Sequence, residues 1–252
     1  MCFDHDALPP VPPVSGGSVF REDLVLSAAD GNTFAAMGAT GDNEAGSAVV
    51  VLPDVRGLYP FYEELAAQLA AQGYDAVAFD YFGRTAGVGK RGDDFSFMDH
   101  VEQTTFDGIR LDVAAAVENV RREDPARKVF TIGFCFGGSN SWHQAANGHG
   151  LAGAVGFYGH PNRLFPPGAA PVVERVYDME CPILGLMGGA DPSIPAEEVE
   201  RFDAALSTAG VAHEIVTYPG APHSFFDRAY DKYQEECDDA WQRLLEFFGT
   251  HS

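Results

Sequence analysis

The sequence predicts a single α/β domain, with a mostly parallel central sheet covered by helices on both faces. The chain has 252 residues, of which 46% are hydrophobic, and this is enough for one sizeable core. Short apolar segments typical of buried strands alternate with longer amphipathic segments typical of helices. No repeat or second domain is evident. We therefore expect an extended lead-in over residues 1–17, rich in Pro and Gly, and one domain over residues 18–252.

The first two strands are predicted to form an antiparallel hairpin. Residues 22–28 (EDLVLSA) and 33–40 (TFAAMGAT) are separated by a short turn that contains Asp30-Gly31, a pair typical of hairpin turns. The uninterrupted apolar run SAVVVLP over 47–53 follows, and it is typical of a strand buried on both faces.

The rest of the domain is predicted to alternate between helices and strands. Residues 61–73 form a helix in this prediction, because Leu65 and Leu69 lie one turn apart and a glycine ends the segment. The glycine-rich stretch over 81–98 is long enough to be a functional loop. Further strands are expected at 75–80, 128–134, 151–159, 181–189 and 212–220. Residues 99–123 are expected to be mostly helical, and further helices are expected at 137–147, 194–210 and 228–248.

Composition argues against several classes of protein. The net charge of −21, with no basic cluster, disfavours binding to nucleic acid or to an anionic membrane. No apolar run approaches the roughly 18 residues of a membrane span, and the N-terminus lacks the pattern of a signal peptide. The four cysteines are far apart without a CxxC pair, which argues against a zinc ribbon or a disulfide framework. We expect a cytoplasmic protein with a small-molecule substrate, either a monomer or a weak homo-oligomer.

The stretch GFCFGG over 133–138 carries the strongest chemical signal. Cys135 directly follows an expected strand and has glycines at both second neighbours, Gly133 and Gly137. This is the pattern of a sharp strand-to-helix turn that exposes a nucleophile, with Cys in place of Ser. The glycines let the strand and the helix approach closely. The alternative is a buried structural cysteine, which does not need glycines at these positions.

An acid and then a histidine are expected after later strands. Asp191 follows the strand 181–189 in GGADPSIP, and His223 follows the strand 212–220 in PGAPHSFF. The order nucleophile, acid, base is therefore satisfied. A thiol beside an imidazole and a helix N-terminus forms the reactive thiolate more readily, and Asp191 would fix the tautomer of His223. The alternatives are a turn or N-cap role for Asp191 and an ordinary loop position for His223.

Further groups are expected around this triad. The backbone N–H groups of Phe136 and Val55 are the predicted oxyanion donors, because they follow the nucleophile and the early strand. Tyr158 and His160 end a strand at the presumed active edge and are candidates for supporting groups. Aromatic side chains near the motifs predict an apolar acyl pocket or, alternatively, belong to the core: Tyr59, Tyr81, Phe82, Phe134, Phe136, Tyr158 and Phe225.

The segments GFCFGG, GGADPSIP and PGAPHSFF, with the tail AYDKYQEECDDAWQRLLEFF, together resemble the dienelactone hydrolase family of α/β-hydrolases. The resemblance covers about residues 20–248. It implies the α/β-hydrolase fold and a triad of Cys135, Asp191 and His223. It also implies hydrolysis of an ester or lactone through an acyl-cysteine intermediate, with no metal and no cofactor.

The resemblance also bears on substrate binding. The family carries a thiol-activating glutamate after the early strand, and Asp54 stands there, one methylene shorter; a loop-capping role is the alternative. The family holds a substrate carboxylate with two arginines. Arg84 matches one of them, whereas Asp227 stands at the second position and Arg228 follows it.

Two other functions are compatible with the sequence. Thioester hydrolysis or acyl transfer would use the same triad and differ only in the acceptor. A redox-sensing or ligand-binding protein with the same shell would have Cys135 oxidised rather than acylated.

Overall fold

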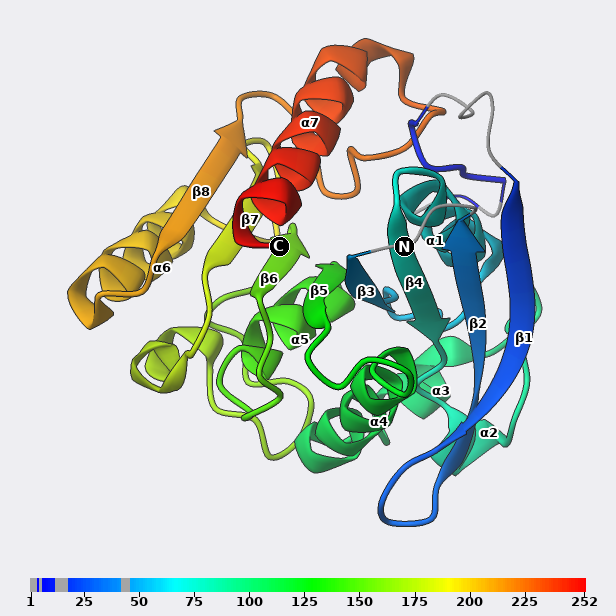
Figure 1. Ribbon diagram of the computed structural model, residues 1–252. Coiled ribbons are helices and arrows are strands. Elements are labelled where there is room, and N and C mark those ends of the chain that lie inside the picture. Colours follow the sequence, from blue (N-terminus) through cyan, green and yellow to red (C-terminus); the bar gives the residue numbers. More distant parts are fainter. Residues whose placement is uncertain (1–3, 5, 12–17, 42–45) are drawn as a thin grey trace.

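The computed structural model describes residues 4, 6–11, 18–41 and 46–252 of the chain. Eight strands of these residues form one sheet in the order β1-β2-β4-β3-β5-β6-β7-β8, which runs from right to left in Figure 1. β1 pairs antiparallel with β2 and β2 with β4, and all other neighbours are parallel. The strands are β1 Val19–Ser27, β2 Thr33–Gly41, β3 Ser47–Leu52, β4 Tyr74–Phe79, β5 Lys128–Phe134, β6 Gly153–Phe157, β7 Ile183–Gly188 and β8 His213–Tyr218.

Helices cover both faces of this sheet, as the sequence predicts. α1 and α7 pack on one face, and α4 and α5 pack on the other, with α6 beside β8 (Figure 1). The helices are α1 Pro60–Ala71, α2 Gly83–Ala86, α3 Phe97–Val101, α4 Phe106–Val120, α5 Phe136–Gln144, α6 Ala196–Ala209 and α7 Gln234–His251. The α/β fold class is therefore confirmed.

The alternation of side chains in β3 shows how the two cores form. Val49 and Val51 are fully buried in the cluster that contains Leu65 of α1. Val50 is fully buried in the cluster on the other face, which contains Val113 of α4. A strand that is covered on both faces needs apolar side chains at every position, and this explains the uninterrupted run in the sequence.

The stretch over 99–123, predicted to be mostly helical, holds the end of one helix and the whole of another. α3 ends at Val101, and α4 begins only at Phe106. Thr105 interrupts the helix because its backbone is extended and its hydroxyl oxygen accepts a hydrogen bond from the N–H of Gly108, at 3.1 Å. The stretch over 81–98, predicted as a loop, contains α2 and the start of α3.

The C-terminal helix begins later than predicted, at Gln234 rather than at residue 228. Asp227 forms a turn there, because its carboxylate accepts the N–H of Ala229 at 3.0 Å. The described part of the N-terminal lead-in runs against this turn: the N–H of Arg228 donates to the carbonyl of Leu8 at 3.0 Å. The rest of the predicted lead-in lies outside the described residues.

The parallel strands place their carboxyl ends at one edge of the sheet, where α/β proteins form their sites. The loops after β3, β5, β6, β7 and β8 therefore gather at this edge. Across the residues that the structure describes, no helix is long and apolar enough to cross a membrane. Nor does this part of the chain bring together three His, Cys, Asp or Glu side chains that could hold a metal ion.

Candidate active site

The turn between β5 and α5 holds Cys135 in a strained backbone conformation. Its φ is 56° and its ψ is −112°, which a residue with a side chain rarely adopts. A Cβ on Gly133 would lie 1.9 Å from the carbonyl oxygen of Gly137. A Cβ on Gly137 would lie 2.1 Å from the carbonyl oxygen of Leu52, at the end of β3. Both glycines are therefore required by close backbone contacts around the turn.

Cys135 differs from the two other cysteines that the structure describes. Cys135 is partly exposed, whereas Cys181 and Cys237 are buried. Burial raises the pKa of both buried thiols to about 12, so they are protonated near neutral pH. Of these three cysteines, Cys135 is the one placed to react with a ligand.

A cavity of about 240 Å³ opens beside Cys135. Val55 and Phe136, the two predicted oxyanion donors, line it together with the cysteine. The other walls come from α3 and the residue after it, with Met98, Val101 and Glu102, and from the first turn of α5, with Ser139. The segment after β6 adds Tyr158, His160, Arg163 and Phe165. The volume is suited to a small molecule.

Asp191 and His223 form a hydrogen-bonded pair next to this cavity. Nδ1 of His223 donates to one oxygen of Asp191. The other oxygen accepts from the N–H and the hydroxyl of Ser193, at 2.8 and 2.6 Å. Burial acts to raise the pKa of Asp191, but the hydrogen bonds from His223 and Ser193 outweigh it and lower that pKa. The imidazole ring lies 4.9 Å from the ring of Tyr158, which lines the cavity.

Arg84 does not line the cavity, although the family motif aligns it with a substrate-binding arginine. Its guanidinium lies 2.5 Å from Asp112 and 2.7 Å from Asp30, so two carboxylates of the protein already bind it. Arg228 is also placed elsewhere: its guanidinium donates to the carbonyl of Val11 in the N-terminal segment. Both guanidinium groups are therefore bound by groups of the protein itself.

Two of the predicted aromatic residues are core residues beside the site. Tyr81 is buried, and its hydroxyl donates to the carbonyl of Pro53 at 2.9 Å, which anchors the loop that carries Val55. Phe225 is fully buried and packs against Tyr158 with ring centroids 5.7 Å apart. Of the predicted pocket aromatics, Phe136 and Tyr158 line the cavity.

Asp54 is buried at the start of the loop after β3 and is bound by a neighbour. It accepts the backbone N–H of Arg56 at 2.8 Å and its guanidinium at 3.0 Å. Burial alone would lower the pKa of Arg56, but Asp54 more than offsets this and raises it. Asp54 follows Pro53, whose carbonyl binds the Tyr81 hydroxyl. The Tyr81 ring also packs against the ring of Phe136, the neighbour of Cys135, with centroids 5.2 Å apart.

The structure adds site residues that the sequence does not reveal. Glu102 and Arg163 bring opposite charges to the cavity wall. Glu198 lies beside His160, a residue already expected near the site. The short helix α3 could have been found from the amphipathic stretch FSFMDHV. No sequence signal connects Glu198 with the segment after β6.

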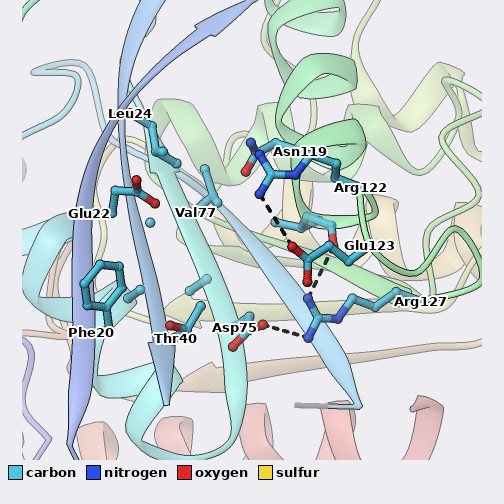
Figure 2. Close-up of a pocket in the computed structure, with 14 residues that line it drawn as sticks. Phe20, Glu22, Leu24, Thr40, Asp75, Val77, Asn119, Arg122, Glu123 and Arg127 are labelled. Atoms are coloured by element: carbon cyan, nitrogen blue, oxygen red, sulfur yellow. Dashed lines mark hydrogen bonds and ion pairs between the residues drawn. The ribbon is translucent and has the colours of Figure 1, made fainter. Parts of the chain in front are cut away.

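A second cavity, of about 250 Å³, lies far from this chemistry, between β1, β2, β4 and the end of α4 (Figure 2). Arg127 donates to Asp75 there at 2.7 Å, and Arg122 lies 3.8 Å from Glu123. Its lining contains none of the predicted triad residues. The cavity beside Cys135 is therefore the candidate active site.

A mostly parallel sheet with this turn after β5, and with an Asp–His pair after β7 and β8, defines an α/β-hydrolase. Comparison with known proteins narrows the class further. Residues 34–252 match the model of the dienelactone hydrolase family, and the chain belongs to this family.

Individual relatives agree with this assignment. The carboxymethylenebutenolidase of Rhodococcus opacus is 31% identical over 231 residues, which cover 83% of each protein. A Yersinia pestis protein that provisionally carries the same name is 32% identical over 210 residues, or 81% of this chain and 78% of that protein. The crystal structure of a provisionally named dienelactone hydrolase from Klebsiella pneumoniae superposes with a TM-score of 0.82 at 28% identity, covering 92% of this chain and 99% of that one. The protein is therefore a hydrolase, as its sequence predicts.

Proposed function

We propose that the protein hydrolyses small carboxylic esters or lactones, with Cys135 as the nucleophile. The observation that carries the proposal is the strained turn that presents Cys135 to a small cavity, with the Asp191–His223 pair beside it. The name of the Rhodococcus relative, which denotes a butenolide lactone substrate, supports a lactone or ester bond as the target.

In the first chemical step, His223 takes the proton of the Cys135 thiol, and the thiolate attacks the carbonyl carbon of the substrate. The hydrogen bond of Nδ1 to Asp191 leaves the lone pair on Nε2, which makes His223 a base in the correct tautomer. Asp191 also stabilises the imidazolium that forms.

The attack turns the carbonyl oxygen into an oxyanion. In the proposal, the backbone N–H groups of Phe136 and Val55 donate to it; both residues line the cavity together with Cys135. When the oxyanion collapses, the bond to the leaving oxygen breaks, and His223 returns its proton to that oxygen. In a lactone, the released alcohol stays attached to the acyl group.

Water then cleaves the acyl-cysteine. His223 takes a proton from the water, whose oxygen attacks the thioester carbon, and the Cys135 sulfur leaves and is reprotonated. The acid product is released, and the enzyme returns to its starting state.

The triad is tested by kinetics and by mass spectrometry. Cys135→Ala and His223→Ala should each lower kcat on short esters by several orders of magnitude, and the double variant should be little worse because the residues act as a unit. Asp191→Asn should also lower kcat strongly, because it favours the wrong tautomer of His223. Cys181→Ala is the matched control and should keep its activity.

An activated ester should acylate the peptide that contains Cys135, and mass spectrometry detects the adduct. An adduct on another cysteine, or turnover in Cys135→Ala, would refute the proposal.

We propose that Asp54 helps to activate the Cys135 thiol. Its ion pair with Arg56 allows an experiment that distinguishes this role from a purely structural one. Asp54→Asn keeps the shape of the side chain and removes the charge that pairs with Arg56. A role in activation predicts a lower kcat in the folded variant. A role in holding the loop predicts a lower free energy of unfolding with the kcat of the folded protein unchanged.

A further inference from the structure

The segment from the end of β7 through the first turn of α6 places a carboxylate beside each of two imidazoles. Asp191, in the loop, binds His223. Glu198, in the first turn of α6, places Oε2 3.5 Å from Nδ1 of His160. His160 follows β6 and lines the Cys135 cavity, so the site has a second imidazole–carboxylate pair.

The burial of this second pair determines where its proton lies. Nδ1 of His160 and Oε2 of Glu198 are both buried and lie 3.5 Å apart, and neither makes a hydrogen bond with any of the described residues. Leaving two such atoms unsatisfied is unfavourable, whereas a proton on Nδ1 directed at the carboxylate satisfies both. Nε2, which is not among these buried atoms, then carries the lone pair and is the accessible nitrogen of the ring.

The surroundings of His160 favour the neutral form of its imidazole. Burial lowers its pKa from the usual value, and this is the largest effect on the group. The charged groups that face it oppose one another: Glu198 and Asp191 act to raise the pKa, whereas Arg163 and His223 act to lower it. A neutral ring with its proton on Nδ1 offers the cavity a hydrogen-bond acceptor.

His160 is held at a fixed place relative to the nucleophile. Its backbone N–H donates to the hydroxyl of Ser139 at 2.7 Å, and this hydroxyl donates to the carbonyl of His160 at 3.1 Å. The N–H of Ser139 in turn donates to the carbonyl of Cys135 at 3.3 Å. One buried side chain therefore connects the turn that carries Cys135 with the backbone of His160.

We propose that His160, supported by Glu198, determines specificity by accepting a hydrogen bond from a hydroxyl or N–H group of the substrate. The inference rests on the proposed function, because the substrate in question is the one that acylates Cys135. Much of the cavity wall is apolar, with Val55, Val101 and Phe165, so an acceptor held at a fixed place in it constrains the orientation of a ligand. The expected substrates are small esters or lactones with a donor group near the scissile bond.

The tautomer can be measured without turnover, by ¹⁵N NMR of the histidine side chains at pH 7, with His160→Leu to assign the signal. The wild type should carry its proton on Nδ1 of His160. In Glu198→Gln, the amide can donate to Nδ1, and the proton should move to Nε2. Glu197→Gln, an equal charge change at an exposed neighbour, should leave the tautomer unchanged. A wild-type His160 with its proton on Nε2, or a doubly protonated ring, would overturn the inference.

Matched esters test the recognition itself. One pair is the 2-hydroxyethyl and 2-methoxyethyl esters of butanoic acid, and the other is the ethyl esters of 3-hydroxybutanoic and 3-methoxybutanoic acid. A methoxy group cannot donate, so the wild type should favour the hydroxyl member of at least one pair by about tenfold in kcat/KM. His160→Leu and Glu198→Gln should bring this ratio close to one, and Glu197→Gln should preserve it.

The two proposals fail in distinguishable ways. Ester turnover that persists in Cys135→Ala would contradict the proposed function. Turnover that depends on Cys135 but is equal for both members of each pair, or a hydroxyl preference that survives in His160→Leu, would contradict the role of His160. The tautomer measurement decides the inference even with esters that the enzyme turns over slowly.

Discussion

Asp112 is a buried carboxylate whose charge depends on one arginine. Burial raises its pKa to about 6, in spite of the lowering effect of Arg84 at 2.5 Å. Asn32 also donates to Asp112, at 3.0 Å, so the hairpin turn, the segment after β4 and α4 meet at this carboxylate. The residue that matches a substrate-binding arginine by sequence therefore holds three parts of the fold together.

Arg84→Ala should therefore destabilise the protein, and the loss should depend on pH. Above about pH 6 the carboxylate of Asp112 is charged and would lose its main cation, with an expected cost of about 1–3 kcal/mol at pH 8. Near pH 5 the carboxyl group takes up a proton, so the same substitution should cost less. Urea unfolding at the two pH values measures the difference.

The control for this prediction is Arg122→Ala, because Arg122 is exposed and 3.8 Å from its nearest carboxylate. It should change stability little at either pH. A selective loss of activity on carboxylate-bearing esters in Arg84→Ala, with normal stability, would instead restore the substrate-binding role predicted from the sequence.

At the scale of elements, α5 rests directly on the end of β3. The backbone of Gly137 is so close that a Cβ would lie 2.1 Å from the carbonyl oxygen of Leu52 and 2.3 Å from that of Pro53. The loop with Val55 continues from this contact. The packing of one strand against one helix therefore sets the distance between the two proposed oxyanion donors.

Gly137→Ala should separate α5 from this loop. We expect kcat on short esters to fall at least about tenfold and the free energy of unfolding to fall by about 1–3 kcal/mol, as for other overpacked sites. Gly249→Ala is the control, because a methyl group there meets no atom within 4 Å. It should be neutral or slightly stabilising. Wild-type stability and turnover in Gly137→Ala would contradict this account of the motif.

The elements that could be predicted from sequence are those with a strong local cause. β3 is buried on both faces, so its apolar run is uninterrupted, and the elbow glycines are fixed by backbone contacts within the motif. The mostly helical character of 99–123 could be predicted, whereas the position of the break at Thr105 depends on a single side-chain cap. The positions of Asp191 and His223 follow from strand ends, and the structure places the two in contact. The partners of Arg84 and His160 come from the approach of α4 and α6, which no short stretch of sequence encodes.

At the scale of the whole molecule, the charge of −21 acts against the compact state. The chain has 37 acidic and 16 basic residues, so most carboxylates have no cation of their own. The resulting repulsion is screened by salt. We expect the free energy of unfolding at pH 7 to rise by about 1 kcal/mol between about 0.01 and 0.3 M NaCl, and the urea midpoint to rise with it.

A matched measurement near the isoelectric point separates repulsion from other effects of salt. The pI is about 4.5, so at pH 5 the net charge is small and the same salt should change the midpoint less. If salt lowers stability at pH 7, ion pairs such as Arg127–Asp75 dominate over the general repulsion.

Asp191 and Glu198 lie seven positions apart, on opposite sides of the start of α6. An α-helix turns by about 100° for each residue. One residue inserted after Pro195 would rotate Glu198 away from His160, while Asp191, ahead of the insertion, would keep its hydrogen bond to His223. Under the proposed role of His160, chain length at this junction can therefore change which substrate is recognised and leave the Asp191–His223 pair in place. Related chains that differ by a single insertion here would catalyse the same reaction on different substrates.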